Sequence, residues 1–292
     1  MNYWDQYLLP KSIDEALAML HEGEGNAKVI AGGTDLLLDI LQKRHPAVEV
    51  LIDITQIPEM RVIEHENDRI YIGGGATHNE IIANPLLQRN ARCLVQASSL
   101  IGGNQVRNVA TIGGNVAHAL PAGDGSIALL ALDAEAEIAS RASRRWIALE
   151  DLFLGPRKPA FDSHKEILVR FRFPLLEAGE STIFQRVMRP QGMAIAILNM
   201  ATWMRKSVEG IIEDIRIAIG PAGPKPLRAR KTEESFRGKE VNEETLSEAV
   251  IVLQEEVRLR TSPHRATRAY REHLLSVLLG RQFEHVGPQR GR

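Results

Sequence analysis

Two Gly-Gly pairs constrain this chain of 292 residues more than any other feature of its sequence. Each pair follows a short apolar run and precedes a small polar side chain, in Ala31-Gly-Gly-Thr-Asp35 and in Thr111-Ile-Gly-Gly-Asn115. Glycine permits a positive φ and lets bare backbone approach a ligand closely. Successive N–H groups in such a turn can form a concavity that binds an anion. The pairs therefore predict either two ordinary tight turns or two turns that hold opposite sides of one diphosphate.

The first pair lies between a predicted strand and a predicted helix. Residues 28–31 are expected to form a short buried strand, and residues 36–44 follow as a helix for which Thr34 and Asp35 are suitable N-cap residues. A strand, a glycine turn and a helix N-terminus together favour a bound phosphate. The Asp35 carboxylate is a poor neighbour for a diphosphate, so we expect it to cap the helix or to bind a sugar hydroxyl. A second buried strand at 48–54 completes a β–α–β unit.

The second pair lies in the least regular part of the sequence. Two Gly-Gly-Asn units begin 11 residues apart, and small, nearly uncharged residues continue from the second unit to Asp124. The pattern fits neither a simple strand nor a simple helix, and it predicts a long loop over residues 101–124. Loops longer than ~12–15 residues are usually functional. We expect Asp124 to bind a ribityl or ribose hydroxyl, or to cap a helix over residues 126–132.

The remaining periodicity predicts an α+β chain with two units. A capping box opens a first helix over residues 13–21. After the β–α–β segment, the expected elements of the first unit are hairpins at 61–72 and 135–147, helices at 78–83 and 92–100, a loop at 153–159 and a strand at 166–173. The second unit is expected to contain strands at 182–188, 194–205 and 211–219 and helices at 243–258 and 265–279.

Charge and composition indicate which kinds of binding partner and cofactor are not expected for this chain. The net charge of −1 gives no electrostatic reason to expect nucleic acid or a membrane surface. No apolar run reaches the ~18 residues of a membrane span, and the N-terminus lacks the basic and apolar regions of a signal peptide, so we expect a cytoplasmic protein. The single cysteine, Cys93, is expected to pack in a helix. One thiol excludes an internal disulfide and an iron–sulfur cluster held by this chain alone, and the histidine spacing predicts no metal site.

The glycine motifs resemble those of a known family. Ala31-Gly-Gly-Thr-Asp-Leu36 and Thr111-Ile-Gly-Gly-Asn-Val116 are similar, in this order, to motifs of the FAD-binding medium subunit of molybdenum hydroxylases, of the xanthine dehydrogenase and carbon monoxide dehydrogenase type. The resemblance includes Gln105-Val-Arg-Asn-Val-Ala, residues 121–124 and the strand at 166–168, and it covers nearly the whole chain. It implies a two-subdomain FAD-binding fold of the vanillyl-alcohol oxidase (PCMH) type, followed by a small C-terminal α/β domain with a three-stranded antiparallel sheet and helices.

The resemblance also implies domain boundaries. The FAD-binding domain would cover residues 1–176, with subdomains of about 1–57 and 58–176. The C-terminal domain would cover residues 177–285, and residues 286–292 would form a loose tail.

The site residues follow from the same resemblance. The first glycine segment would hold the FAD diphosphate and lie near the adenosine side, and the second segment would hold the diphosphate from the other side. Asp124 would bind the sugar-like chain, and a strand of the second unit would pass the flavin. The residues expected to bind FAD are Lys28, Val29, Ile30, Ala31, Gly32, Gly33, Thr34, Asp35, Leu36, Ile101, Thr111, Gly113, Gly114, Asn115, His118, Asp124, Ile167, Leu168, Phe184 and Gln185.

One departure from the family concerns the charge beside the flavin. Many relatives carry a lysine next to the aromatic residue on this strand, where the present chain has Gln185 after Phe184. Arg186 or Arg189 are the alternative sources of a positive charge. Some relatives also insert a cysteine-bearing loop for a 4Fe–4S cluster, and the single Cys93 excludes that variant.

The implied function is electron transfer within an oxidoreductase complex. A large molybdopterin-binding subunit would hydroxylate the substrate, a small subunit would pass the electrons through 2Fe–2S clusters to FAD in this chain, and FAD would reduce NAD or another acceptor. The three chains would form a heterotrimer, alone or dimerised. No catalytic residue is predicted here because the cofactor supplies the redox chemistry. His118 is either a hydrogen-bonding loop residue or a proton donor. A self-contained FAD oxidoreductase and a non-catalytic binding module stay open as alternatives.

Overall fold

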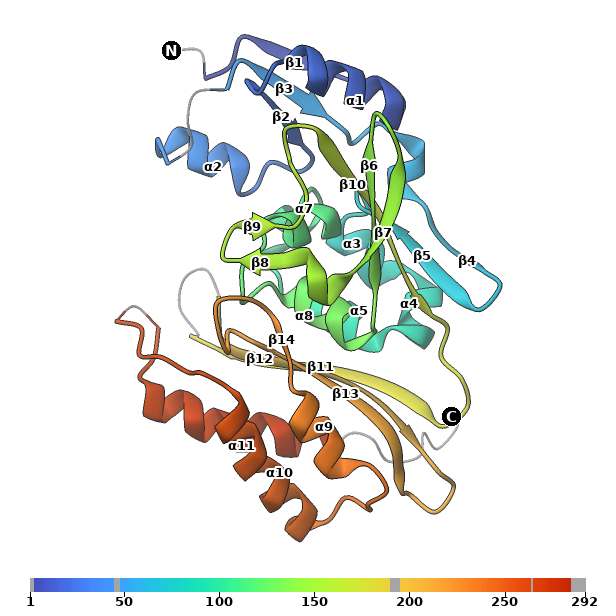
Figure 1. Cartoon of the computed structure of the whole chain (residues 1–292), viewed down its shortest axis with the longest axis vertical. Helices are drawn as coiled ribbons and strands as arrows, with labels where there is room; N and C mark the ends of the chain where they lie inside the picture. The colour runs from blue at the N-terminus through green and yellow to red at the C-terminus, as the bar shows by residue number, and fades with distance from the viewer. Residues whose placement is uncertain (1–2, 45–47, 190–194, 264, 285–292) are drawn as a thin grey trace.

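The computed structural model describes residues 3–44, 48–189, 195–263 and 265–284. Three main β-sheets follow one another along the long axis of the molecule, and each sheet has its own helices (Figure 1). None of the helices in the described ranges combines the length and the apolarity needed to cross a bilayer.

The N-terminal sheet contains three parallel strands in the order β1-β3-β2. Its elements are β1 (Gln6–Leu8), α1 (Ile13–Glu22), β2 (Ala27–Ile30), α2 (Leu36–Leu41) and β3 (Val50–Asp53). The hydroxyl of Ser12 accepts a hydrogen bond from Glu15 N at 3.2 Å and caps α1, which packs its apolar face against Ile52 and against Ile167 of the next sheet. The predicted β–α–β unit is confirmed. Strand β1 was not predicted because three residues are too few to show a period.

The middle sheet is antiparallel and has the order β4-β5-β10-β6-β7. Its strands and the short turns beside them are η1 (Pro58–Arg61), β4 (Ile63–Glu66), β5 (Arg69–Gly73), β6 (Glu135–Ser140), β7 (Arg144–Ala148), η2 (Leu149–Leu152) and β10 (Glu166–Pro174). Both predicted hairpins are confirmed. The predicted loop at 153–159 is instead a small hairpin of β8 (Phe153–Gly155) and β9 (Lys158–Pro159).

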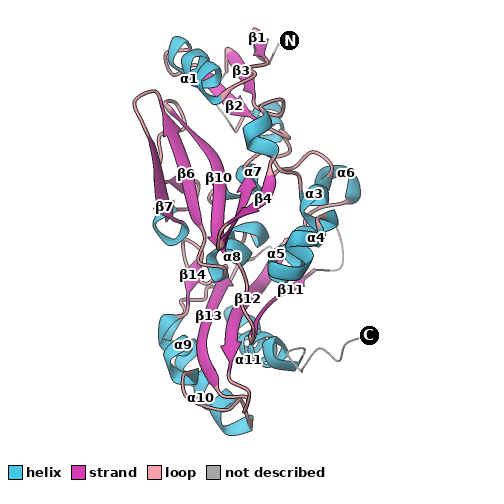
Figure 2. Ribbon diagram, turned by 90° about the vertical axis from the view of Figure 1, so that its right-hand side faces the viewer, coloured by secondary structure: helices cyan, strands magenta, loops and turns pink. Residues whose placement is uncertain are grey.

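Helices cover one face of the middle sheet (Figure 2). They are α3 (His78–Ala83), α4 (Pro85–Asn90), α5 (Arg92–Ser99), α6 (Asn104–Arg107), α7 (Ile112–Ala117) and α8 (Asp124–Ala131). The capping box predicted at Thr77 and Glu80 is present and opens α3. Cys93 is fully buried on α5, as expected for a packing role, and burial raises the pKa of its thiol to about 12.

The C-terminal sheet is antiparallel, and it has four strands rather than the predicted three. Its strands are β11 (Glu180–Met188), β12 (Ala196–Lys206), β13 (Ile212–Gly220) and the two-residue β14 (Leu227–Arg228). One face packs through Phe184, Ala201 and Ala218 onto the helices of the middle unit. The other face packs on α9 (Arg230–Phe236), α10 (Glu243–Glu256) and α11 (Arg268–Glu284).

Two features of this C-terminal unit differ from the prediction. Helix α9 was missed because it has seven residues with no clear apolar period. Helix α11 begins at Arg268 and continues to Glu284, beyond the predicted end at residue 279. The predicted loose tail at 286–292 lies outside the described residues.

A buried ion pair lies at the joint between the middle and C-terminal units. The side chains of Arg228 and Glu233 are 4% and 2% exposed, and Nε of Arg228 lies 2.7 Å from Oε1 of Glu233. Arg228 also reaches Asp133, which follows α8, at 3.4 Å. The arginine therefore compensates a buried carboxylate and contacts the preceding unit at the same time.

Replacing Arg228 with methionine should lower the free energy of unfolding by about 3–5 kcal/mol, because Glu233 would keep a buried charge without its partner. Arg237 offers a matched control, since its side chain is 40% exposed and pairs with Asp214 at 2.9 Å. Arg237→Met should cost about 1 kcal/mol or less. Urea unfolding followed by circular dichroism measures both values, and equally small losses would contradict the prediction.

Candidate cofactor site

The two glycine segments lie against each other in the structure. Gly32 has no room for a side chain, because a Cβ atom added there would stand 1.9 Å from the carbonyl oxygen of Val109. A second contact joins the residues that follow the two pairs, where Nδ1 of His118 lies 3.5 Å from Oδ2 of Asp35. Segments about 80 residues apart in the sequence thus form one contact region.

The turn between β2 and α2 presents a row of free N–H groups. Gly33 has a φ of 68°, which glycine adopts without strain. None of the N–H groups of residues 32–36 donates a hydrogen bond to any residue in the described ranges. The turn is partly exposed and precedes a helix, whose N-terminal end carries a partial positive charge. It therefore has the chemistry of a phosphate-binding turn.

Asp35 does not have the predicted capping role. It occupies the N-cap position of α2, but its side chain makes no capping hydrogen bond. The carboxylate faces His118 instead, and the histidine ring holds the pKa of Asp35 below its usual value, with Arg157 acting in the same direction. Sugar binding by Asp35 stays a prediction.

The second glycine pair is not a turn with positive φ. Thr111 is the N-cap of α7, and Gly113 and Gly114 lie in the first turn of this helix. The N–H groups here already have partners: Gly113 N donates to Gly74 O at 2.8 Å, and Gly114 N donates to the Thr111 hydroxyl at 3.0 Å. This segment therefore offers fewer free donors to an anion than the β2–α2 turn does.

The predicted long loop over residues 101–124 is also wrong, because the segment contains α6 and α7. Glycine disfavours helix in isolation, but tertiary packing overrides that preference here. A Cβ atom at position 113 would stand 2.5 Å from Gly74 O, so the glycine lets α7 approach the backbone after β5. Asn115 connects α7 to α8, since its side-chain oxygen accepts a hydrogen bond from Ser126 N at 3.2 Å.

Asp124 lies in the buried joint between the middle and C-terminal units. It is the first residue of α8 and makes no cap, so the capping alternative is wrong. Its carboxylate accepts hydrogen bonds from Arg186 Nη1 and, at 2.7 Å, from Asn199 Nδ2. Burial raises the pKa of Asp124, and both partners oppose that shift. Nε of Arg186 and Oδ1 of Asn199 are buried and have no partner among the described residues, so the cluster can bind a further polar group.

The strand predicted to pass the flavin places its residues on two faces. Phe184 is 2% exposed and packs in the core under α5, whereas Gln185 points to the opposite side of the sheet. Arg186 shares the face of Phe184 and pairs with Asp124. Arg186 and Arg189 are the two alternative sources of a positive charge beside the flavin. Arg186 is buried, and its charge is compensated by Asp124. Arg189 donates a hydrogen bond from Nε to the Arg265 carbonyl at 3.2 Å.

Strand β10 lies directly behind the second glycine pair. Gly74 connects the two, because its N–H donates to Val169 O at 2.7 Å and its carbonyl accepts the bond from Gly113. Leu168 is 6% exposed and packs in this core, whereas Ile167 packs with α1 on the other side. Ile101 is half-buried, and its carbonyl accepts a hydrogen bond from Arg107 Nη1 at 3.1 Å.

The other end of the first segment is mostly apolar. Ile30 is buried in the N-terminal cores, and Val29, Ala31 and Leu36 are partly buried against them. Lys28 is the exception, since its Nζ lies 3.2 Å from the Ser163 hydroxyl. Burial lowers the pKa of this lysine.

Sequence reasoning missed the hairpin that ties these segments together. Arg157 Nη1 donates to Asp39 Oδ2 at 2.7 Å, and Arg157 N donates to Ala119 O at 3.0 Å, so the β8–β9 hairpin connects α2 to the end of α7. The only sequence signal for this connection is Asp39, because it is a charged residue inside the apolar run Leu-Leu-Leu-Asp-Ile-Leu. In the structure the Asp39 side chain is buried. Neither Arg157 nor Asn199 belongs to a recognisable motif.

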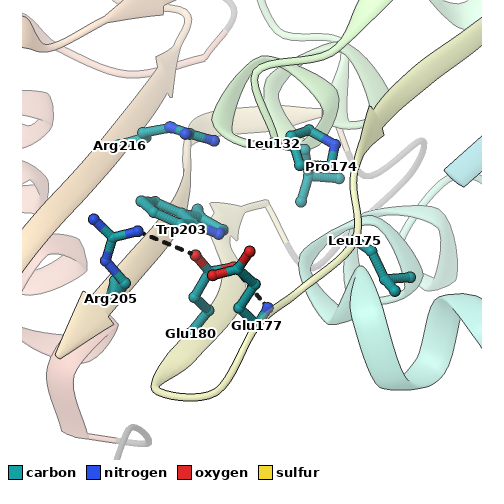
Figure 3. A pocket seen from close by; sticks show the side chains of 8 residues that line it. All are labelled: Leu132, Pro174, Leu175, Glu177, Glu180, Trp203, Arg205 and Arg216. Atoms are coloured by element: carbon teal, nitrogen blue, oxygen red, sulfur yellow. Dashed lines mark hydrogen bonds and ion pairs between the residues drawn. The ribbon is translucent and has the colours of Figure 1, made fainter. Parts of the chain in front are cut away.

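A separate hollow lies between the β10–β11 connection and the C-terminal sheet (Figure 3). Arg216 stacks over the Trp203 ring, with its guanidinium carbon 4.0 Å from the ring centroid. Arg205 pairs with Glu180 at 3.7 Å on the other side of the ring. None of the residues expected to bind FAD lines this hollow, so we do not assign it to the cofactor.

Replacing Gly32 with alanine should destabilise the fold by about 1–3 kcal/mol, because the new methyl group would force the Val109 carbonyl away from the turn. Gly155→Ala is the matched control, since nothing lies within 4 Å of a Cβ atom at that position. Thermal unfolding measures both variants. A Gly32→Ala protein as stable as Gly155→Ala would show that the two segments do not pack as described.

Comparisons with family models and with known proteins identify relatives of this chain. Residues 3–176 match the family model of the FAD binding domain in molybdopterin dehydrogenase, and residues 183–286 match that of the CO dehydrogenase flavoprotein C-terminal domain. The carbon monoxide dehydrogenase medium chain of Hydrogenophaga pseudoflava is 33% identical over 244 residues, which cover 84% of each chain. The glyceraldehyde dehydrogenase medium chain of Sulfolobus acidocaldarius is 29% identical over 282 residues, which cover 96% of this chain and 97% of the relative.

The fold also matches a solved structure. Carbon monoxide dehydrogenase from Hydrogenophaga pseudoflava, in a form that lacks the Mo-pyranopterin moiety of the molybdenum cofactor, superposes with a TM-score of 0.90 at 30% identity over 96% of both chains. The predicted resemblance and fold class are therefore confirmed. Because one family model spans more than half of the sequence and a second follows it, the chain belongs to the family of FAD-binding medium subunits of molybdenum hydroxylases.

Proposed function

We propose that this chain binds FAD with the diphosphate on the turn between β2 and α2 and with α7 beside it. The observation that carries the proposal is the contact between the two glycine segments, together with the free N–H groups of the turn. A diphosphate needs several hydrogen-bond donors and tolerates no bulky side chain near the backbone. Gly32 and Gly33 meet the second requirement and residues 32–36 meet the first, so the residues present fit the cofactor.

The other predicted residues take positions around this centre. Lys28 would lie toward the adenosine side, and Asp124, held by Arg186 and Asn199, would lie toward the flavin side with Ile101 and Leu168. Phe184 would support that end from below rather than touch the ring, because it is buried in the core. Gln185 is the predicted residue least consistent with a direct role, since it faces the opposite side of the sheet.

The proposed role of the bound FAD is to carry electrons between protein partners. FAD supplies the redox chemistry, and this chain binds and orients it. We propose that a small 2Fe–2S subunit delivers the electrons, that a large molybdopterin-binding subunit carries the substrate site, and that NAD or another acceptor takes the electrons from FAD. Two relatives are named medium chains, a term that implies partner chains of other sizes. We propose a heterotrimer, alone or dimerised.

Purified chain incubated with FAD and then desalted should retain the visible absorbance of a bound flavin. At a free FAD concentration of 100 times the dissociation constant, binding should add about 2.7 kcal/mol to the free energy of unfolding. Riboflavin, which lacks the diphosphate, should add much less and serves as the control. A colourless protein whose thermal unfolding is unchanged by FAD would favour the non-catalytic module.

Affinity purification of the tagged chain from its native cells should separate the two oxidoreductase alternatives. The electron-transfer role predicts a complex that contains molybdenum and 2Fe–2S clusters, measured by metal analysis and electron paramagnetic resonance. Flavin reduction by substrate should then require the partner chains. A flavin-loaded single chain that turns over a substrate by itself would support the self-contained oxidoreductase instead.

A further inference from the structure

The segment that leads into α11 concentrates positive charge. Residues 257–271 contain five arginines and neither an aspartate nor a glutamate. The segment ends in the first turn of α11, which packs on the C-terminal sheet, whereas the β2–α2 turn belongs to the N-terminal sheet at the opposite end of the molecule (Figure 1). The proposed FAD site therefore makes no use of this charge.

Arg271, in the first turn of α11, is a buried cation that no acid of this chain compensates. The residue is 3% exposed, and its Nε has no hydrogen-bond partner among the described residues. The described ranges contain every aspartate and glutamate of the chain, and none of these forms an ion pair with Arg271. An arginine does not lose its proton in a protein, so burial does not neutralise it. Burying an uncompensated ion is strongly unfavourable, so this side chain favours a bound anion beside it.

Two further arginines lie beside Arg271. The Thr261 hydroxyl accepts a hydrogen bond from Arg268 N at 3.0 Å, which folds the preceding segment back on the start of α11. Burial lowers the pKa of Arg271, and the charges of Arg265 and Arg260 lower it further, so these guanidinium groups act on one another. The fold thus brings three cations together at one buried position.

The surrounding groups add positive charge and supply no acid. Nε of Arg189, just after β11, donates to the Arg265 carbonyl at 3.2 Å, which brings a fourth guanidinium to this segment. The acid nearest to Arg271 in the sequence, Glu272, pairs with Arg268 at 2.7 Å on the exposed side of α11. An anion beside Arg271 would therefore lie among positive charges.

We propose that Arg271, Arg265 and Arg260 form a binding site for a phosphate group, with Arg271 at its buried end. Exposure rises from Arg271 through the half-buried Arg265 to the exposed Arg260, so a ligand can enter from the solvent. A planar guanidinium donates two parallel hydrogen bonds to phosphate oxygens. A phosphate group carries about two negative charges at neutral pH and can offset more than one arginine. Free phosphate and the diphosphate of a nucleotide share this chemistry, and the test below separates them.

The first measurement is the stability of the chain without phosphate. Arg271→Met removes the buried charge and keeps an unbranched side chain, so in chloride buffer its thermal midpoint should be unchanged or higher, by about 2–4 °C. A structural arginine with a partner inside the protein would give the opposite result, because its loss would leave that partner unsatisfied. A lower midpoint for Arg271→Met therefore overturns the inference.

The second measurement is the affinity for phosphate, pyrophosphate and ADP, titrated calorimetrically at matched ionic strength because salt screens charges. Arg271→Met should bind pyrophosphate about tenfold or more weakly than the unmodified chain. Arg265→Met, at a half-buried position, is a second variant and should weaken binding in the same direction. Arg281→Met is the matched control, since it removes the same charge from an exposed position about 15 Å further along α11. It should bind as the unmodified chain does.

The ligands distinguish the source of the phosphate. An Arg271-dependent affinity for ADP that equals or exceeds that for pyrophosphate supports a nucleotide, and a weaker one supports a free phosphate or diphosphate. Equal affinities of the unmodified, Arg271→Met and Arg265→Met chains for all three ligands overturn the inference. A chain that fails to bind FAD leaves it standing, because this site shares no residue with the β2–α2 turn.

Discussion

The contact between Gly32 and the carbonyl of Val109 is the constraint on which the candidate site depends. Any Cβ atom at this position would overlap the carbonyl oxygen, so backbone meets backbone without an intervening side chain. The contact joins the N-terminal sheet to the helical layer of the middle unit. It places the end of one strand beside the start of α7, where neither segment alone would form a site.

The two glycine pairs have different physical roles in this contact. The first pair lies in a turn where Gly33 has a positive φ and where the N–H groups of residues 32–36 donate to no other described residue. The second pair is helical, and Gly113 allows α7 to pack against the backbone at Gly74. The first pair thus provides backbone donors for a ligand, and the second pair lets a helix pack closely against a neighbouring backbone. A Gly-Gly pair in a sequence can indicate either a ligand-binding turn or close packing against another backbone segment. Only the three-dimensional structure distinguishes these two roles.

Much of the fold could be predicted from the sequence because its elements carry local signals. Helices α1 and α3 begin at side-chain caps, and apolar and charged residues alternate along part of strand β10. The failures share a different cause. Helix α7 forms in spite of two glycines, because packing against Gly74 outweighs local preference. The pairings of Arg157 with Asp39 and of Asp124 with Asn199 join residues more than 70 positions apart, and no periodicity within one segment encodes them.

The buried cluster of Asp124, Arg186 and Asn199 has a consequence for how the chain can be divided. The carboxylate comes from the unit that precedes β11, and its two partners come from β11 and β12. A fragment that stops before β11 would retain the acid and lose both groups that compensate it, together with the sheet that covers α5 and α8. The C-terminal unit therefore forms part of the packing of the middle unit and is not an independent addition to it. A chimera that takes its C-terminal unit from a relative would have to keep Asp124, Arg186 and Asn199.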